Sequence, residues 1–551
     1  MQSVTPNQRT HTSNGDGANS QSSTNSDDAL VVGAGFAGLY MLHRLVGMGL
    51  KARIIEAAPD VGGTWYWNRY PGARCDIESM QYSYQFSEEL QQEWNWKERY
   101  SAQPEILSYI QHVADRFDLR QHIEFGTRVT AATFNEDQSQ WAVQTDAGEN
   151  LTARFFIMAV GCLSTTIMPQ TEGTFDFKGP VYHTGKWPVG GVDFTGKKVG
   201  VIGTGSSGVQ IIPHIAEQAE HLSVFQRTPG YVVPAQNRPL DPDEVAEIKS
   251  NYSELRAEGR AHPIAFIFPM HKDSALDATE EERKERFEKQ WKVGGLPFAA
   301  AYGDLLTNDD SNKLVVEFWK SKMQEIVKDP RIAEMLTPDQ VYGCKRIPSG
   351  TNYFETYNRP NVTLVDVGGT GVEKFTEKGI LAKDEEHELD AIVMATGFDA
   401  LTGSVISINI TGKNGEKIND KWRDGPANYI GLAVSGFPNM FNMLGPGCPG
   451  VLATMVTGAE QQGDWIADCI GWMDQNGKNT IEADLDSETA WVKEVHDLGM
   501  TSIRSTCSSW YVGANVPGKP HVFMPYAGGF NNYVARCNDT AKNNYKGFSF
   551  S

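Results

Sequence analysis

Long apolar runs and the residue pattern of a signal peptide are both missing from these 551 residues. No run of about 18 apolar residues occurs, so the sequence predicts no transmembrane helix and no membrane partner. Residues 1–27 consist mostly of small and polar residues and lack the basic start and apolar core of a signal peptide. We expect these residues to form a disordered tail.

An excess of basic charge and paired cysteines are missing as well. The 49 Lys and Arg residues are outnumbered by 69 Asp and Glu residues, and the net charge of -20 argues against nucleic acid and anionic membranes as partners. The seven cysteines are scattered and odd in number, and no two form a CxxC pair. This pattern predicts a reducing, cytoplasmic location, without a disulfide framework and without a metal site.

Two segments with the same pattern of residues are present: ALVVGAGFAGLYMLHRL and KKVGVIGTGSSGVQIIPHI. In each, a short apolar strand runs into GxGxxG and then into an amphipathic helix, which predicts two dinucleotide-binding units. The glycines permit a tight turn, and the helix N-terminus offers free N–H groups to a pyrophosphate. The expected nucleotide contacts are Gly33, Gly35, Phe36, Ala37 and Gly38 in the first loop, and Thr204, Gly205, Ser206, Ser207, Gly208, Val209 and Gln210 in the second.

The order of apolar strands predicts an α/β fold in which one unit is inserted into the other. Buried-looking strands end near residues 160 and 395, where the chain is expected to leave and re-enter the first unit. We assign residues 28–160 and 385–551 to the first unit, and residues 161–230 and 335–384 to the second. The charged, helically spaced residues 231–334 predict a helical insertion that covers the domains.

The end of the second strand in such a unit carries the residue that reads the adenosine ribose, about 20 residues beyond the first glycine. In the first unit this residue is Glu56, whose carboxylate accepts ribose hydrogen bonds and repels a 2′-phosphate, as FAD or NAD requires. In the second unit it is Arg227 beside Thr228, and a guanidinium pairs with the 2′-phosphate of NADP. The opposite charges predict electron flow from NADPH to a flavin.

A glycine- and aromatic-rich segment, VGGTWYWNRYPGARCDIES, follows Glu56 directly. Gly63 permits close backbone approach, and the aromatic side chains of Trp65, Tyr66 and Trp67 could form a wall of an isoalloxazine site. Clusters of this kind are more often core than cofactor wall, so the residues alone leave both interpretations open.

The pattern Phe177-x-Gly179-x-x-x-His183-x-x-x-Trp187-Pro188, with a GxGxxG loop on either side, resembles the fingerprint of flavin-dependent Baeyer–Villiger monooxygenases. The resemblance covers nearly the whole chain beyond the tail and includes GTGSSGVQ, GCKRIPSGTNYFETYNRPNV, ATGFDALTG and SSWYVGANVPGKP. It is strongest to the phenylacetone and steroid monooxygenase branch.

The resemblance implies a reaction and its cofactors. NADPH would reduce a tightly bound FAD, and the reduced flavin would react with O2 to give a C4a-peroxyflavin that converts a ketone to an ester or lactone. NADP+ would stay bound meanwhile, and sulfoxidation is the expected side activity. A monomer or weak oligomer is expected.

The resemblance also implies roles for individual residues. Arg346 would stabilise the oxygen anion, and Asp76 would pair with it. Lys345 would reach the 2′-phosphate of NADP with Arg227. Trp510 would lie on a mobile loop that folds over NADP and substrate. Further flavin contacts are implied at Thr64, Trp65, Arg74, Cys75, Tyr82, Val129 and Met455.

Three rival functions remain. A sister flavin monooxygenase that oxidises nitrogen or sulfur would share both units, although it typically carries another aromatic residue at the position of Trp187. A disulfide reductase needs a redox-active cysteine pair, which this sequence lacks. A non-catalytic NADP-sensing flavoprotein would not need Arg346 and Asp76. The fingerprint itself lies in FKGPVYHTGKWP, where we expect a domain linker in which His183 couples the two units through hydrogen bonds.

Overall fold

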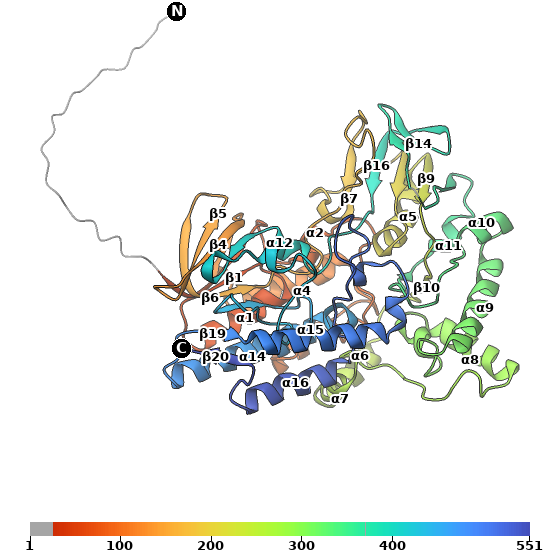
Figure 1. The fold of residues 1–551 in the computed structure, drawn as a ribbon. Helices are drawn as coiled ribbons and strands as arrows, with labels where there is room; N and C mark the ends of the chain where they lie inside the picture. The colour runs from red at the N-terminus through yellow and green to blue at the C-terminus, as the bar shows by residue number, and fades with distance from the viewer. Residues whose placement is uncertain (1–25, 370) are drawn as a thin grey trace, which may run out of the picture.

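Two β-sheets, each with helices packed against it, form the body of the protein (Figure 1). The computed structural model describes residues 26–369 and 371–551. The eight-stranded sheet of the first unit has the order β17 (Asn409–Thr411), β4 (Val129–Asn135), β5 (Gln140–Thr145), β6 (Asn150–Met158), β1 (Asp27–Val32), β2 (Ala52–Glu56) and β3 (Ile123–Phe125), and β18 (Met440–Asn442) also pairs with β6. Strands β6, β1, β2 and β3 are parallel, as in a dinucleotide-binding unit.

The second unit is built on a five-stranded, all-parallel sheet. Its order is β12 (Val362–Asp366), β9 (His221–Gln226), β8 (Lys198–Ile202), β16 (Ala391–Met394) and β7 (Val181–His183). Among the smaller sheets, β14 (Gly379–Ala382) lies between β13 (Lys374–Phe375) and β15 (Glu385–Glu388). Strand β10 (Val233–Pro234) pairs with β11 (Ser349–Gly350), and β19 (Ile481–Ala483) pairs with β20 (Phe548–Phe550).

Helices cover both sheets. Those of the first unit and its C-terminal part are α1 (Phe36–Gly47), α2 (Thr64–Trp67), α3 (Glu88–Glu93), α4 (Gln103–Arg116), α12 (Gly403–Ile406), α13 (Ile418–Lys421), α14 (Met455–Gln475), α15 (Leu485–Met500) and α16 (Phe530–Lys542). The second unit has α5 (Ser206–Gln218) and α11 (Tyr353–Thr356). Short 3₁₀ turns occur along the whole described chain: η1 (Arg120–His122), η2 (Thr184–Lys186), η3 (Leu296–Ala300), η4 (Lys413–Gly415), η5 (Gly450–Leu452), η6 (Ile503–Ser505) and η7 (Trp510–Val512).

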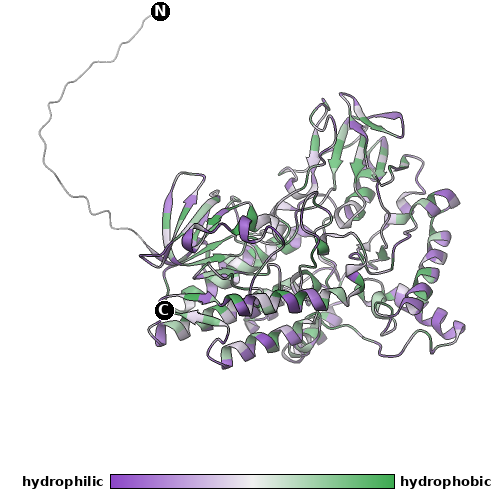
Figure 2. Ribbon diagram, in the orientation of Figure 1, coloured by the Kyte–Doolittle hydropathy of each residue, from purple (hydrophilic) through white to green (hydrophobic). Residues whose placement is uncertain are grey.

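Strand β1 shows why its sheet needs cover on both faces. Ala29 and Val31 point into the core that α1 and α14 form, whereas Leu30 and Val32 point into a second core with Trp141. A strand buried on both faces is apolar throughout, as the run ALVV is. Figure 2 shows the same distribution, with apolar strands inside and hydrophilic outer helix faces.

The segment expected as the insertion, 231–334, contains α6 (Pro242–Ser250), α7 (Tyr252–Ala261), α8 (Glu280–Val293) and α9 (Asp309–Ile326), and α10 (Pro330–Met335) begins within it. It is more than a solvated cover. Tyr252 and Phe266 join the core of the first unit, whereas Phe287 and Trp319 join that of the second. The insertion therefore packs against both units.

Two expected boundaries are wrong. Asp27, which was placed in the predicted tail, is the buried first residue of β1. Residues 1–25 of that tail lie outside the described part of the chain. Strand β16 and the preceding β15 belong to the second unit, so the chain returns to the first unit after Met394 rather than at residue 385. An apolar strand followed by glycine looks the same in either sheet, and only its pairing partner distinguishes them.

The expectation about cysteines is also wrong for one pair. Cys344 and Cys507 form a disulfide with their Cα atoms 5.7 Å apart, although 163 residues separate them in sequence. The remaining five cysteines are free and buried: Cys75, Cys162, Cys448, Cys469 and Cys537. Pairing depends on which loops the fold brings together, which cysteine spacing does not reveal over such a distance.

No helix within residues 26–369 and 371–551 combines the length and the apolar character needed to cross a bilayer.

Packing at the first glycine loop generates a stability prediction. A Cβ atom on Gly38 would lie 1.8 Å from the carbonyl oxygen of Gly33, so Gly38→Ala must push α1 away from β1. We expect the free energy of unfolding to fall by about 1–3 kcal/mol in a denaturant titration. Gly47→Ala, in the same helix, is the matched control because a Cβ there meets nothing within 4 Å. It should leave stability unchanged or raise it by up to about 1 kcal/mol, and equal losses in both variants would contradict this account.

Candidate active site

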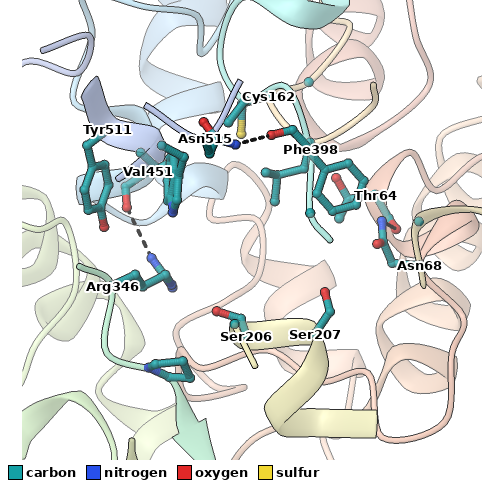
Figure 3. Close-up of a pocket in the computed structure, with 18 of the residues that line it drawn as sticks. Thr64, Asn68, Cys162, Ser206, Ser207, Arg346, Phe398, Val451, Tyr511 and Asn515 are labelled. Carbon is teal, nitrogen blue, oxygen red and sulfur yellow. Dashed lines mark hydrogen bonds between the residues drawn. The ribbon is translucent and has the colours of Figure 1, made fainter. Parts of the chain in front are cut away.

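A cavity of about 1750 Å³ lies where the glycine loops of the two units face one another (Figure 3). Most of the predicted site residues line it. They are Gly33, Gly35, Phe36, Ala37, Glu56, Gly63, Thr64, Trp65, Trp67, Arg74, Cys75, Asp76, Tyr82, Val129, Thr204, Gly205, Ser206, Ser207, Gln210, Arg227, Thr228, Lys345, Arg346, Met455 and Trp510. The cavity thus brings together residues from both units and from the C-terminal segment.

Four predicted residues lie outside the cavity lining. At Gly38 and Gly208, each glycine-rich helix packs closely against the end of its own strand. A Cβ on Gly208, for example, would lie 2.2 Å from the Gly203 carbonyl oxygen. Val209 is fully buried in the core of the second unit. Tyr66 packs edge-on against Trp67 and under the guanidinium of Arg69. These positions shape the loops without facing the cavity.

Arg346 and Asp76 form a two-pronged ion pair at the cavity wall. Nη2 of Arg346 lies 2.6 Å from both carboxylate oxygens of Asp76, and its Nε lies 3.2 Å from Oδ2. The Asp76 charge is the main cause that raises the pKa of Arg346 further above its ordinary value. Nη1 is directed at the Val451 carbonyl oxygen at 3.4 Å, as Figure 3 shows. The guanidinium is therefore charged, oriented and still open to the cavity.

Both glycine-rich helices begin at the cavity without a side-chain cap. Gly35 precedes α1 and Gly205 precedes α5, and the first turn of neither helix contains an acidic residue. Their free N–H groups and partial positive charge suit phosphate groups. Gly63 has φ +52°, and a Cβ there would meet the Cα of Gly35 at 2.8 Å, so two backbones approach closely at the first loop.

Glu56 is a buried carboxylate that holds the first loop together. Its two oxygens accept hydrogen bonds from the backbone N–H groups of Ala34, at 2.6 Å, and Ala58, at 2.7 Å. Burial raises the pKa of Glu56, and the bond from Ala34 opposes this rise. The side chain still lines the cavity, so the position expected to read a ribose also orders the loop.

Arg227 and Lys345 are two cations at the other end of the cavity. Burial, followed by the charge of Arg227, lowers the pKa of Lys345. Neither side chain has an ion-pair partner among the described residues. Thr204 Oγ1 donates to the Thr228 carbonyl oxygen at 3.4 Å, which ties the second glycine loop to the end of β9. Two like charges that repel one another provide a suitable site for a phosphate dianion.

The aromatic segment after Glu56 surrounds the first glycine loop and docks on the second unit. Trp65 Nε1 donates to the Tyr82 hydroxyl at 3.2 Å, and burial raises the pKa values of Tyr82 and of the Cys75 thiol. Gln210 of α5 donates to the Arg74 carbonyl oxygen at 2.9 Å. The Arg74 guanidinium itself is paired with Glu98, so it serves to hold this segment in place.

These observations test whether the site fits FAD and NADP. The first loop offers an uncapped helix start, a close glycine approach and the carboxylate of Glu56, which suit a dinucleotide with a free ribose. The second loop offers another uncapped helix start with Arg227 and Lys345 nearby, which suits a 2′-phosphate. The residues present fit both groups.

His183 of the fingerprint joins the two linkers between the units. Its Nδ1 accepts from the Gly185 N–H at 2.9 Å, so Nε2 carries the proton and donates to Thr396 Oγ1 at 3.2 Å. Thr396 Oγ1 in turn donates to the Ile167 carbonyl oxygen at 2.5 Å. This chain of bonds supports the predicted coupling role. Trp187 packs on Tyr182 and Phe194 and is absent from the cavity lining.

Several cavity residues were given no individual role from the sequence. Val451, Tyr511 and Asn515 line it beside the expected Met455 and Trp510, and Asn515 Nδ2 donates to the Phe398 carbonyl oxygen at 2.8 Å (Figure 3). The phenol of Tyr511 acts electrostatically on Arg346, so the two side chains are neighbours. The position of Tyr511 directly after Trp510 was the one available signal.

The buried imidazole generates a pH prediction. Burial lowers the pKa of His183 to about 4, below the unfolded value of about 6.5. The unfolded chain therefore binds the proton first, and the free energy of unfolding falls as the pH drops from about 6.5 toward 4. His183→Asn should remove about 1–2 kcal/mol of the stability difference between pH 7.5 and pH 5, measured by urea titration. The exposed His496→Asn is the control, and equal pH dependence of wild type and His183→Asn would contradict the prediction.

Comparisons with known proteins agree with this geometry. Residues 27–244 match the family described as flavin-binding monooxygenase-like. The chain is 44% identical over 511 residues to a Baeyer–Villiger monooxygenase of Pseudooceanicola batsensis, covering 92% of this chain and 93% of that protein. It is 40% identical over 525 residues to phenazine N-monooxygenase PhzNO1 of Lysobacter antibioticus, covering 95% and 96%.

A solved structure of oxidised steroid monooxygenase bound to NADP superposes with a TM-score of 0.90, at 48% identity over 95% of this chain and 99% of that chain. Identity at this level over nearly the full length, together with two glycine loops facing one cavity, is shared ancestry rather than a common fold alone. The chain belongs to the Baeyer–Villiger branch of the flavin-binding monooxygenases.

Proposed function

We propose that this chain catalyses the NADPH- and O2-dependent oxidation of ketones to esters or lactones. The observation that carries the proposal is the Arg346–Asp76 pair, which lies on the wall of a cavity that both nucleotide loops line. When bound, FAD reduced by NADPH supplies the chemistry that activates O2. The protein supplies position and charge.

Arg346 stabilises the negative charge that develops on the carbonyl oxygen of the ketone. A guanidinium stays charged at any pH at which the protein is folded, and its contact with Asp76 fixes its direction before the substrate arrives. Preorganised donors of this kind cost no reorganisation during the reaction. Asp76 therefore acts by orienting Arg346.

The substrate region has an apolar side next to this charge. Cys162, Leu163, Val451, Met455 and Trp510 belong to one hydrophobic cluster and all line the cavity. Apolar side chains on one side and the Arg346 guanidinium on the other suit a compact apolar molecule with one carbonyl group. We propose such ketones as the substrate class.

Nitrogen oxidation is the second candidate, because one relative at 40% identity is a phenazine N-monooxygenase. Sulfoxidation is a further candidate as a side activity. Trp187 is the position at which the sister classes differ in sequence. It packs inside the second unit and does not line the cavity, so it does not itself select between a ketone and an amine. Reaction products are the test that distinguishes these functions.

A panel of aryl, linear and cyclic ketones, a thioether, a tertiary amine and phenazine separates the candidates. We expect ester or lactone with stoichiometric NADPH loss for at least one ketone, identified by gas chromatography and mass spectrometry. Products from phenazine or the amine alone would favour nitrogen oxidation. NADPH loss that no compound stimulates would overturn all the candidates.

Arg346→Ala separates flavin reduction from oxygen transfer. The variant should keep the rate of flavin reduction by NADPH within about threefold and lose ester formation by at least about 100-fold, as expected when an oxyanion donor is removed. Anaerobic stopped-flow absorbance and product yield measure the two steps. Arg331→Ala is the control, since that side chain is 88% exposed. A normal ester yield from Arg346→Ala would refute the assigned role.

Arg227→Ala tests the nucleotide assignment. Loss of a charge-assisted contact of about 1.5–3 kcal/mol should raise the KM for NADPH roughly 10–100-fold and leave kcat almost unchanged. The KM for NADH, which lacks the 2′-phosphate, should barely change. Steady-state kinetics with both nucleotides, again with Arg331→Ala beside it, measure the preference. An equal effect on both nucleotides would place the phosphate elsewhere.

A further inference from the structure

The disulfide between Cys344 and Cys507 joins two segments of the cavity wall. Cys344 is fully buried and directly precedes Lys345 and Arg346. Cys507 is half-buried and lies between η6 and η7, three residues before Trp510. The bond therefore connects the segment that carries the active-site arginine to the loop that carries Trp510 and Tyr511.

Residues 503–519 form the loop in question, and its two halves are held differently. The second half is anchored to the start of the return segment, since Asn515 binds the Phe398 carbonyl oxygen and Lys519 Nζ lies 2.5 Å from Asp399 Oδ1. Lys519 also donates to the Ala400 carbonyl oxygen at 2.9 Å. This half is fixed by charge and hydrogen bonds.

The first half has no such anchor outside its own segment. Within the described residues, the hydrogen bonds of residues 503–512 connect only to residues of 499–524, such as Ser509 with Val512 and Tyr511 with Met524. Trp510 contributes apolar contacts with the cluster around Cys162. The disulfide is the one covalent link from this half to the Arg346 segment.

We propose that Cys344 and Cys507 are positioning residues of the active site, whose disulfide holds the Trp510–Tyr511 turn against the segment of Lys345 and Arg346. The inference deepens the proposed function, because it concerns the wall shared by the nucleotide and the ketone. With the bond in place, the turn stays attached to the segment of Lys345 and Arg346 through nucleotide exchange. With the bond open, apolar contacts and the hydrogen bonds within residues 499–524 hold the turn.

The two cysteines differ in exposure, and this difference determines which sulfur atom an external reductant attacks. An external dithiol attacks the sulfur of Cys507, the more exposed of the two cysteines, and the electron pair of the S–S bond leaves on the Cys344 sulfur, which then takes up a proton. The second thiol of the reductant then releases Cys507, so that two thiols form and the reductant becomes a disulfide. In the reverse direction, hydrogen peroxide accepts two electrons and two protons from the thiol pair and yields two molecules of water.

The first test is independent of enzyme activity. In FAD-loaded enzyme purified without reductant, differential alkylation with peptide mass spectrometry should find Cys344 and Cys507 linked and the other five cysteines as thiols. Treatment with a phosphine reductant should increase amide exchange roughly tenfold in residues 503–512 and leave residues 515–524 unchanged. Two free thiols in the untreated enzyme would overturn the proposal even if ketone oxidation is confirmed.

The second test uses kinetics. Reduced wild type and Cys507→Ser should both show a KM for NADPH raised roughly tenfold and more NADPH consumed per ester, with flavin reduction at saturating NADPH unchanged. Reoxidation should restore the wild type but not the variant. Thr506→Ser, a neighbour with the bond intact, is the matched control, and Cys507→Ser is preferred to Cys344→Ser because position 344 is fully buried. Identical exchange and identical KM in oxidised and reduced enzyme would refute positioning, and this holds whichever oxidation the enzyme performs.

Discussion

The ion pair of Arg346 and Asp76 depends on both nucleotide-binding units, and most of the surrounding architecture keeps its partners together. Asp76 lies in the aromatic segment of the first unit, whereas Arg346 precedes β11 in the second. A partly buried guanidinium without its carboxylate would be a costly uncompensated charge, so the pair also favours one relative placement of the units. The contact of Gln210 with Arg74 and the helical insertion that joins both cores act in the same direction.

The cavity is positively polarised although the chain carries a net charge of -20. Two uncapped helix starts face it, and Arg227 and Lys345 stand without ion-pair partners among the described residues. Anionic nucleotides are therefore drawn to this one region of an otherwise acidic protein. Because repulsion from Arg227 helps to lower the pKa of Lys345, a phosphate placed between them relieves that repulsion and favours the protonated lysine.

Local patterns were predictable from the sequence, and long-range contacts were not. The glycine loops, Glu56 and Arg227 follow from short motifs whose geometry is set within a strand, a turn and a helix. Arg346 and Asp76 look ordinary on their own, and only the family resemblance singled them out, because their meaning lies in a contact across 270 residues. The Cys344–Cys507 bond and the sheet membership of β16 depend equally on tertiary placement, and both were missed.

Regular elements and loops contribute different parts of the cavity, and only the regular elements carry recognisable sequence motifs. Strands and helix starts bind the parts that the nucleotides have in common, so their pattern is strong and recurs twice in the chain. The cavity wall that we propose faces the substrate comes instead from loops and short turns, at Cys162, at Val451 and at the loop of Trp510. Such segments tolerate substitution without loss of the fold. The fingerprint around His183 thus lies at the hydrogen-bonded linkers between the units, whereas we propose that substrate choice is set where the sequence has no regular pattern.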